Sequence, residues 1–152
     1  MLSGQHNCLM DEKGRVALPA ALHAGLGVGD GNDGAVFILT GSLFDPCLIA
    51  QTEAAFEAQA TKMRTLAPSH PAAVAYMRYV VGSAHTLSVD RAGRVNIPRE
   101  LREQAALERD VVWVGAFDKV ELWSRTRFDE ARKKLSVDDL AAIRAFMTSH
   151  DL

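Results

Sequence analysis

The sequence lacks long hydrophobic runs. Its uninterrupted apolar stretches, such as residues 35–39 and 111–114, are no longer than six residues, whereas a membrane-spanning helix needs roughly 18 or more apolar residues. Residues 1–10 include histidine, asparagine and cysteine and show no apolar core of the kind that a secretory signal peptide has. We therefore expect a cytoplasmic protein that makes no contact with a membrane.

Cysteine and metal-binding patterns are scarce. Cys8 and Cys47 are the two cysteines, which is too few for a disulfide framework, so we expect two reduced, partly buried thiols. The five histidines form no His-x-x-x-His pair, and Cys-x-x-Cys is absent. Residues 6–8 come nearest to a metal motif but have the wrong spacing. We expect neither a metal nor a cofactor.

Catalytic motifs are missing as well. The sequence has no phosphate-binding P-loop and no Gly-x-Ser-x-Gly motif, and it shows no grouping of an acid, a base and a nucleophile. The glycine-rich stretch 27–34 resembles a calcium loop, but Gly34 and Ala35 fall on a ligand position and the turn position, and Gly41 replaces the required glutamate. We interpret it as a flexible surface loop. We expect no enzymatic activity and no small-molecule substrate.

Positive charge is not in excess, since 17 lysines and arginines face 19 aspartates and glutamates, for a net charge of −2. Most free-standing nucleic-acid binders are basic, so bulk electrostatics disfavours DNA binding. A local basic patch, multiplied by oligomerisation, remains compatible with this composition. The hydrophobic fraction of 48% over 152 residues is sufficient for the core of one domain or two very small ones.

The sequence does contain an internal repeat. Residues 11–19 and 90–98 share Asp, Gly, Arg, Val and Pro at equivalent positions. Further on, 37–41 and 111–115 are matching apolar runs that each stop at a glycine. We infer two half-copies of about 45 residues, each too small to fold alone, that pack around a shared core.

Each copy has the pattern of a strand, a tight turn, a second strand and a helix. Gly14 and Gly93 suit the turns because glycine adopts positive φ without steric cost. Asp11 and Asp90 can accept hydrogen bonds from turn N–H groups. The first strands are expected at 7–10 and 86–89, and the helices that begin at the prolines at 19–26 and 98–107.

The middle and the end of the chain have helical spacing of apolar residues. Residues 52–81 predict a helical hairpin, capped by Thr52 and restarted at Pro71. Residues 136–139 resemble a capping box before a final helix. The predicted class is α+β, with two pseudo-repeated β-hairpin and helix units packed as a small β-barrel-like core with flanking helices. We expect a first domain at 5–52, a helical linker at 53–82, a second domain at 83–126, and C-terminal helices with a tail at 127–152.

The repeated arginine is the best candidate for function. Stability alone does not require arginine in both copies, and its planar fork matches phosphate oxygens or a guanine edge. Arg15 and Arg94 are therefore candidate nucleic-acid contacts. Further cations near the motifs can add phosphate contacts: Lys13, Arg91, Arg99 and Arg102.

The motifs resemble those of the MraZ family, bacterial proteins with two SpoVT-AbrB domains. The resemblance rests on residues 11–15 with Pro19, on 90–94 with Pro98, and on 114–123, and it extends from residue 1 to about residue 140. It implies a nucleoid-associated, sequence-specific transcriptional regulator of the division and cell-wall gene cluster. Such proteins form ring-shaped homo-oligomers that bind tandem direct repeats upstream of their own gene.

The same resemblance assigns DNA contact to the repeated motif, that is to Asp11 and Arg15 and to Asp90 and Arg94. The aspartates would orient the turns, which also require Gly14 and Gly93. Lys13 and Arg91 lie at positions of the motif that vary in the family.

Two alternatives remain open. An AbrB-type antitoxin also binds DNA, but it usually carries one such domain and a disordered toxin-binding tail, whereas this chain has two copies and a helical C-terminal part. A β-rich protein-interaction module would have no DNA role. Its binding would be insensitive to salt, whereas phosphate contacts give a steep salt dependence.

Overall fold

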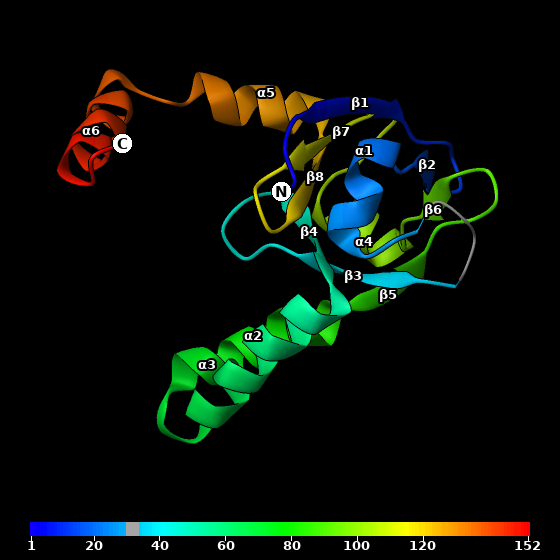
Figure 1. Ribbon diagram of the computed structural model, residues 1–152, viewed down its shortest axis with the longest axis horizontal. Coiled ribbons are helices and arrows are strands. Elements are labelled where there is room, and N and C mark those ends of the chain that lie inside the picture. The colour runs from blue at the N-terminus through cyan, green and yellow to red at the C-terminus, as the bar shows by residue number, and fades with distance from the viewer. Residues whose placement is uncertain (30–33) are drawn as a thin grey trace.

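An antiparallel sheet forms the body of the computed structural model, which describes residues 1–29 and 34–152 (Figure 1). Within these residues the sheet has six strands in the order β1-β7-β8-β4-β3-β5. A separate two-stranded ribbon pairs β2 with β6. The sheet strands are β1 (Gln5–Leu9), β3 (Val36–Gly41), β4 (Cys47–Thr52), β5 (His85–Ser88), β7 (Asp110–Gly115) and β8 (Val120–Ser124). The ribbon strands are β2 (Arg15–Ala17) and β6 (Arg94–Asn96).

The strand order interleaves the two halves of the chain. β1 pairs with β7 and β5 pairs with β3, so each half supplies an edge strand to the other. The repeat makes β1 equivalent to β5, β3 to β7, and β4 to β8. Exchanging these equivalents gives the same strand order, read from the other edge of the sheet. In the ribbon, Val16 lies opposite its own counterpart, Val95. The ribbon therefore pairs the two halves of the chain symmetrically about Val16 and Val95.

The main core lies between the sheet, the ribbon and two short helices, α1 (Ala20–His23) and α4 (Arg99–Gln104). Leu22 and Leu101, at equivalent positions of these helices, are both buried in it. Burial of such a side chain stabilises a fold by roughly 1.5–3 kcal/mol. Trp113 is fully buried, and its indole N–H donates to the Ala17 carbonyl at 3.0 Å. This bond joins β7 to the ribbon.

Longer helices lie outside this core. α2 (Glu53–Leu66) and α3 (Pro71–Tyr79) form a hairpin, and α5 (Arg125–Lys133) follows β8. The hydroxyls of Thr52 and Ser124 cap α2 and α5. Short 3₁₀ turns complete the helical set at Ala24–Leu26, Ala67–Ser69 and Val81–Ser83. None of the described helices has the length and apolar character needed to cross a membrane.

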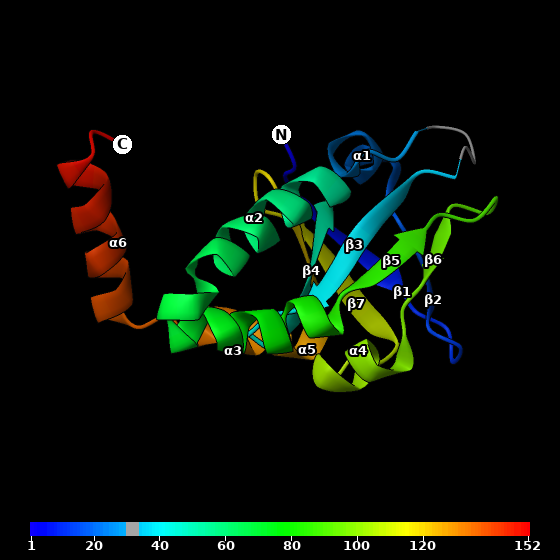
Figure 2. The same ribbon diagram turned by 90° about the horizontal axis from the view of Figure 1, so that it is seen from below.

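The last helix, α6 (Val137–Ser149), projects away from the rest of the molecule (Figure 2). Ser136 and Asp139 form a complete capping box at its start. Figures 1 and 2 both place α6 and the β2–β6 ribbon at opposite ends of the long axis.

Several expectations from the sequence are confirmed. The class is α+β, residues 52–81 form the helical hairpin, and Ser136 begins a capped final helix. Both cysteines are free, with Cys8 half-buried and Cys47 buried. Burial, with smaller effects from the Glu121 and Asp45 carboxylates, raises the pKa of the Cys47 thiol to about 12.

Other expectations need correction. The sheet is open, with β1 and β5 as its edges, so a barrel-like core is not confirmed. The first strands span Gln5–Leu9 and His85–Ser88, slightly earlier than the predicted 7–10 and 86–89. Of the predicted loop at 27–34, residues 30–33 lie outside the described part of the chain.

The two proline-initiated helices are also shorter than predicted. Pro19 and Pro98 precede the first helical residue, because both have extended backbone. The helix predicted at 19–26 is α1 followed by a 3₁₀ turn. The helix predicted at 98–107 ends at Gln104, where the Leu107 N–H bonds the Arg102 carbonyl across a left-handed Ala106. The sequence did not reveal this end because alanine normally favours helix.

Replacement of Ala106 by glycine should stabilise the protein. Ala106 has φ +51°, and the first half uses Gly27 (φ +72°) at the equivalent place. A left-handed conformation costs a non-glycine residue about 1 kcal/mol, so we expect Ala106→Gly to raise the free energy of unfolding by up to that amount. Urea unfolding of the two proteins measures it. A loss of stability would show that the Ala106 methyl contributes more by packing than its backbone costs.

Candidate nucleic-acid interface

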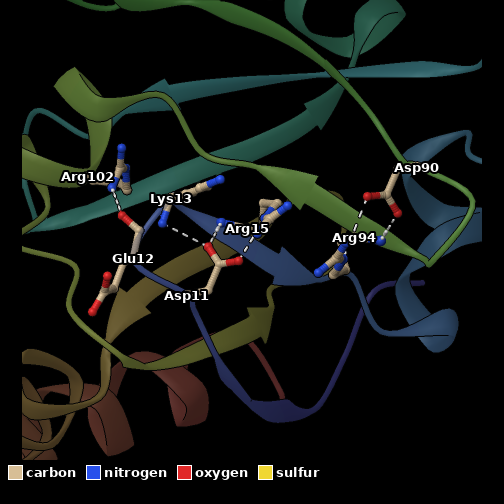
Figure 3. A network of polar contacts seen from close by, with 7 residues as sticks. All are labelled: Asp11, Glu12, Lys13, Arg15, Asp90, Arg94 and Arg102. Carbon is tan, nitrogen blue, oxygen red and sulfur yellow. Dashed lines mark hydrogen bonds and ion pairs between the residues drawn. The ribbon is translucent and has the colours of Figure 1, made fainter.

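The two repeated turns lie at opposite ends of the β2–β6 ribbon (Figure 3). The Gly14 carbonyl accepts from the Ile97 N–H at 2.8 Å, and the Gly93 carbonyl accepts from the Leu18 N–H at 2.9 Å. Each turn is therefore bonded to the strand of the other half. Gly14 and Gly93 have φ of +85° and +76°, which explains why glycine occupies both turns.

Alternation along the ribbon separates an inner from an outer face. Val16 and Val95 are buried in the core. Their neighbours in each strand point to the other side, because successive side chains alternate across a strand. The outer face therefore carries Arg15 and Arg94 at diagonal corners, with the short, exposed side chains of Ala17 and Asn96 at the other two. Asn96 was not among the residues that the sequence predicted.

Asp11 organises the first turn. Its Oδ1 accepts from the backbone N–H groups of Lys13 and Arg15, both at 2.9 Å, and its Oδ2 accepts from Arg15 Nε at 2.7 Å. The bond from the Arg15 N–H is the largest effect that lowers the pKa of the Asp11 carboxyl, with help from the Arg15 side chain and against a desolvation effect that raises it. Asp11 thus shapes the turn and aligns the guanidinium beside it.

Asp90 shapes the second turn in the same way but holds its arginine less closely. Its Oδ1 accepts from the N–H groups of Ala92 and Arg94 at 2.8 and 2.9 Å. Its Oδ2 lies 3.7 Å from Arg94 Nε, beyond hydrogen-bond distance. Arg94 Nε is buried and has no hydrogen-bond partner within the described residues. The two arginines therefore differ in how firmly they are held.

Arg102 supports the first turn, and the second turn has no equivalent support. Its Nη1 donates to the Glu12 carbonyl at 3.4 Å (Figure 3). The equivalent residue in the first half is His23, whose Nε2 lies 2.8 Å from the Leu18 carbonyl instead. The second turn consequently lacks an equivalent brace from α1. The exchange of arginine for histidine at matched repeat positions was the sequence signal for this difference.

The remaining predicted cations lie around the ribbon. Lys13 and Arg91 are exposed at the tips of the two turns. Arg99 is exposed and pairs with Glu103 at 3.0 Å, so it is already partnered. Within residues 1–29 and 34–152, no three His, Cys, Asp or Glu side chains converge as metal ligands.

Comparison with known proteins gives consistent matches. A family model described as "MraZ protein, putative antitoxin-like" matches residues 80–150. A protein of Moorella thermoacetica named "Transcriptional regulator MraZ" is 33% identical over the full length of both chains. Proteins with the same name from Salinispora arenicola and Salinispora tropica are 38% and 39% identical over 94% and 85% of each chain. The chain belongs to the MraZ family.

The residues that match MraZ proteins include the whole interface described above. The match to the Moorella MraZ protein includes both turns and the ribbon. The matched region of the MraZ family model includes the second turn, α4 and α6. The doubled motif therefore belongs to the part of the chain that is shared with MraZ proteins.

The two turn glycines should differ in their tolerance of alanine. Positive φ costs each variant about 1–2 kcal/mol. A Cβ at Gly14 would also lie 2.7 Å from the Ile97 carbonyl oxygen and 2.7 Å from Arg102 Nε, whereas no described atom lies within 4 Å of a Cβ at Gly93. We expect Gly14→Ala to destabilise by about 2–4 kcal/mol and Gly93→Ala by about 1–2 kcal/mol. Thermal and urea unfolding measure both. Equal losses would contradict the close packing of the first turn.

Removal of the Asp11 carboxylate should have a pH-dependent effect. Because its pKa is lowered in the folded state, ionised Asp11 stabilises the fold above its ordinary pKa of 3.8, and this contribution disappears as the pH falls through the lower folded value. Asp11→Asn should therefore be less stable than wild type at pH 7. The difference in free energy of unfolding between the two proteins should narrow below pH 3.8. Unfolding curves between pH 7 and pH 2.5 test this, and a gap that stays constant with pH would exclude the carboxylate charge as the cause.

Proposed function

We propose that the chain is a sequence-specific DNA-binding regulator of transcription. The observation that carries the proposal is the outer face of the β2–β6 ribbon, with arginines at two diagonal corners and short side chains between them. The names of the MraZ relatives support the same conclusion. In this proposal the protein is cytoplasmic and nucleoid-associated.

The ribbon suits the major groove of B-DNA, which admits a two-stranded β-ribbon. Ala17 and Asn96 are short enough to let the ribbon approach the base edges. Arg15 and Arg94 can each present a bidentate fork to guanine or to phosphate oxygens. Lys13 and Arg91, at the exposed tips of the turns, are placed to meet the flanking phosphates.

Assembly would offset the unfavourable net charge. The chain carries a net charge of −2, but its arginines are gathered on one ribbon. Several ribbons in one homo-oligomer would bind the same DNA more tightly than a single weak site, because each ribbon after the first is held close to the DNA at a high effective concentration. We propose a ring, in which successive subunits keep the same polarity. Such an array favours tandem direct repeats spaced by about one helical turn of about 10 bp over a palindrome.

The proposed target is the promoter region of the chain's own gene within the division and cell-wall gene cluster. This assignment rests on the resemblance of the doubled motif to the MraZ family and is tested by binding to that DNA. An antitoxin role is the second candidate, supported by the description of the matched family model. It requires a toxin partner, and binding of that partner would not depend on the ribbon arginines.

Substitution of the ribbon arginines should weaken DNA binding without unfolding the protein. We expect Arg15→Ala and Arg94→Ala each to cost about 1–3 kcal/mol of binding free energy, and the slope of log affinity against log salt to fall by about one for each lost phosphate contact. Mobility shifts on the upstream DNA of the gene, across a range of salt, measure both quantities.

Arg127→Ala is the matched control, because it removes one exposed arginine from α5, away from the ribbon. It should leave affinity nearly unchanged. If Arg15→Ala and Arg94→Ala bind as wild type does, the ribbon is not the DNA interface. If the intact protein shows no salt-sensitive, sequence-selective binding, the regulator function itself is excluded in favour of an interaction module.

A further inference from the structure

Helix α6 carries an exposed apolar surface that no other element of the described residues covers. All of its residues are described, and none is buried. Leu140, Ile143 and Met147 recur at helical spacing on one side, with Val137 and Phe146 at its margins, and these five side chains are 43–83% exposed. A helix of 13 residues is marginally stable in water without tertiary contacts. The surface is therefore expected to have a partner.

The repeat shows why α6 has no partner beside it. In the first half, α3 folds back on α2, and Tyr76 and Val80 join Phe56 over the sheet. In the second half, α5 occupies the place of α2 and uses Phe128 and Ala131 to cover the sheet. The remaining surface of α5 is polar, with exposed Arg127, Glu130, Arg132 and Lys133. It offers no apolar face on which α6 can pack as α3 packs on α2.

The α2–α3 hairpin has complementary properties. Leu66, Val74 and Tyr79 are 41–57% exposed along it. Its acidic residues, Glu53 and Glu57, lie in the first turns of α2. Residues 58–80 contain no Asp or Glu, and their basic side chains are all exposed: Lys62, Arg64 and Arg78. From 137 to 151, in contrast, three aspartates face a single arginine. The acidic, apolar helix α6 and the basic, apolar stretch 58–80 of the hairpin therefore match both in hydrophobic surface and in sign of charge.

We infer that α6 of one copy docks on the α2–α3 hairpin of a neighbouring copy. Figure 1 shows the two elements as separate projections from the sheet, so the contact is made between chains rather than within one. Because two different patches meet, the contact is heterologous and propagates head to tail until it closes. The inference rests on the proposed self-assembly and assigns its contact surfaces. It leaves the β2–β6 ribbon free, since α6 lies at the other end of the molecule.

The first test compares matched lysine substitutions on α6. Ile143→Lys places a charge in the apolar surface, whereas Ala145→Lys places the same charge on the opposite side of the helix. Neither residue is buried in the single chain, so both variants should fold. We expect wild type and Ala145→Lys to form oligomers of the same mass. We expect Ile143→Lys to associate at least tenfold more weakly and to sediment toward the mass of one chain.

The second test identifies the partner surface by charge exchange. One variant reverses the hairpin (Lys62→Glu, Arg64→Glu and Arg78→Glu), and another reverses α6 (Asp138→Lys and Asp151→Lys) while keeping Asp139 in the capping box. Each of these two variants, studied by itself, should associate with its own copies more weakly than wild type does. Mixing the two, or combining all five substitutions in one chain, should restore it, because the reversed helix then meets the reversed hairpin.

Three results would overturn the inference: a monomeric wild type, unchanged assembly of Ile143→Lys, or loss of assembly by the α6 variants without any rescue by the reversed hairpin. The last result would point to contact between two α6 helices. Binding of Ile143→Lys to DNA with a single site is measured in parallel. Retained binding separates failure of the assembly contact from failure of the proposed DNA-binding function.

Discussion

The structure depends on the reciprocal bonding of two turns across one short ribbon. The carbonyls of Gly14 and Gly93 each accept a hydrogen bond from a backbone N–H of the opposite half, on either side of the central Val16–Val95 pair. These contacts fix where each turn stands relative to the core, and hence where Arg15 and Arg94 emerge. A change in the register of the ribbon by one residue would turn the valines outward and the arginines inward. Burial of the valines therefore determines the direction of the arginines.

Local chemistry allowed the turns and caps to be predicted from sequence. Asp11 and Asp90 accept the turn N–H groups as expected, and Thr52 and Ser136 begin their helices. These features depend on residues within four positions of one another, so their spacing is sufficient evidence. The MraZ family was also recognisable from the doubled motif.

Features that depend on distant partners were not predictable in the same way. The repeat predicts a strand before the first turn but does not identify β7 as the partner of β1, since pairing between distant strands leaves no signal in the local sequence. The open sheet was missed for this reason. The brace from Arg102 to Glu12 joins residues 90 positions apart, and its absence from the other half follows from a single histidine, His23. The left-handed Ala106 shortened a helix that composition alone favoured.

The unequal turns give the ribbon an orientation. A symmetric pair of identical hairpins from two chains would meet DNA in the same way after a half-turn rotation, and neither end could be told from the other. Here both hairpins belong to one polypeptide, so Arg102 supports one end while the other end lacks this brace. Substitutions can accumulate in one hairpin without being copied into the other. In the proposed mode of DNA binding, a ribbon of this kind would suit an asymmetric base sequence and would distinguish the two directions along a duplex.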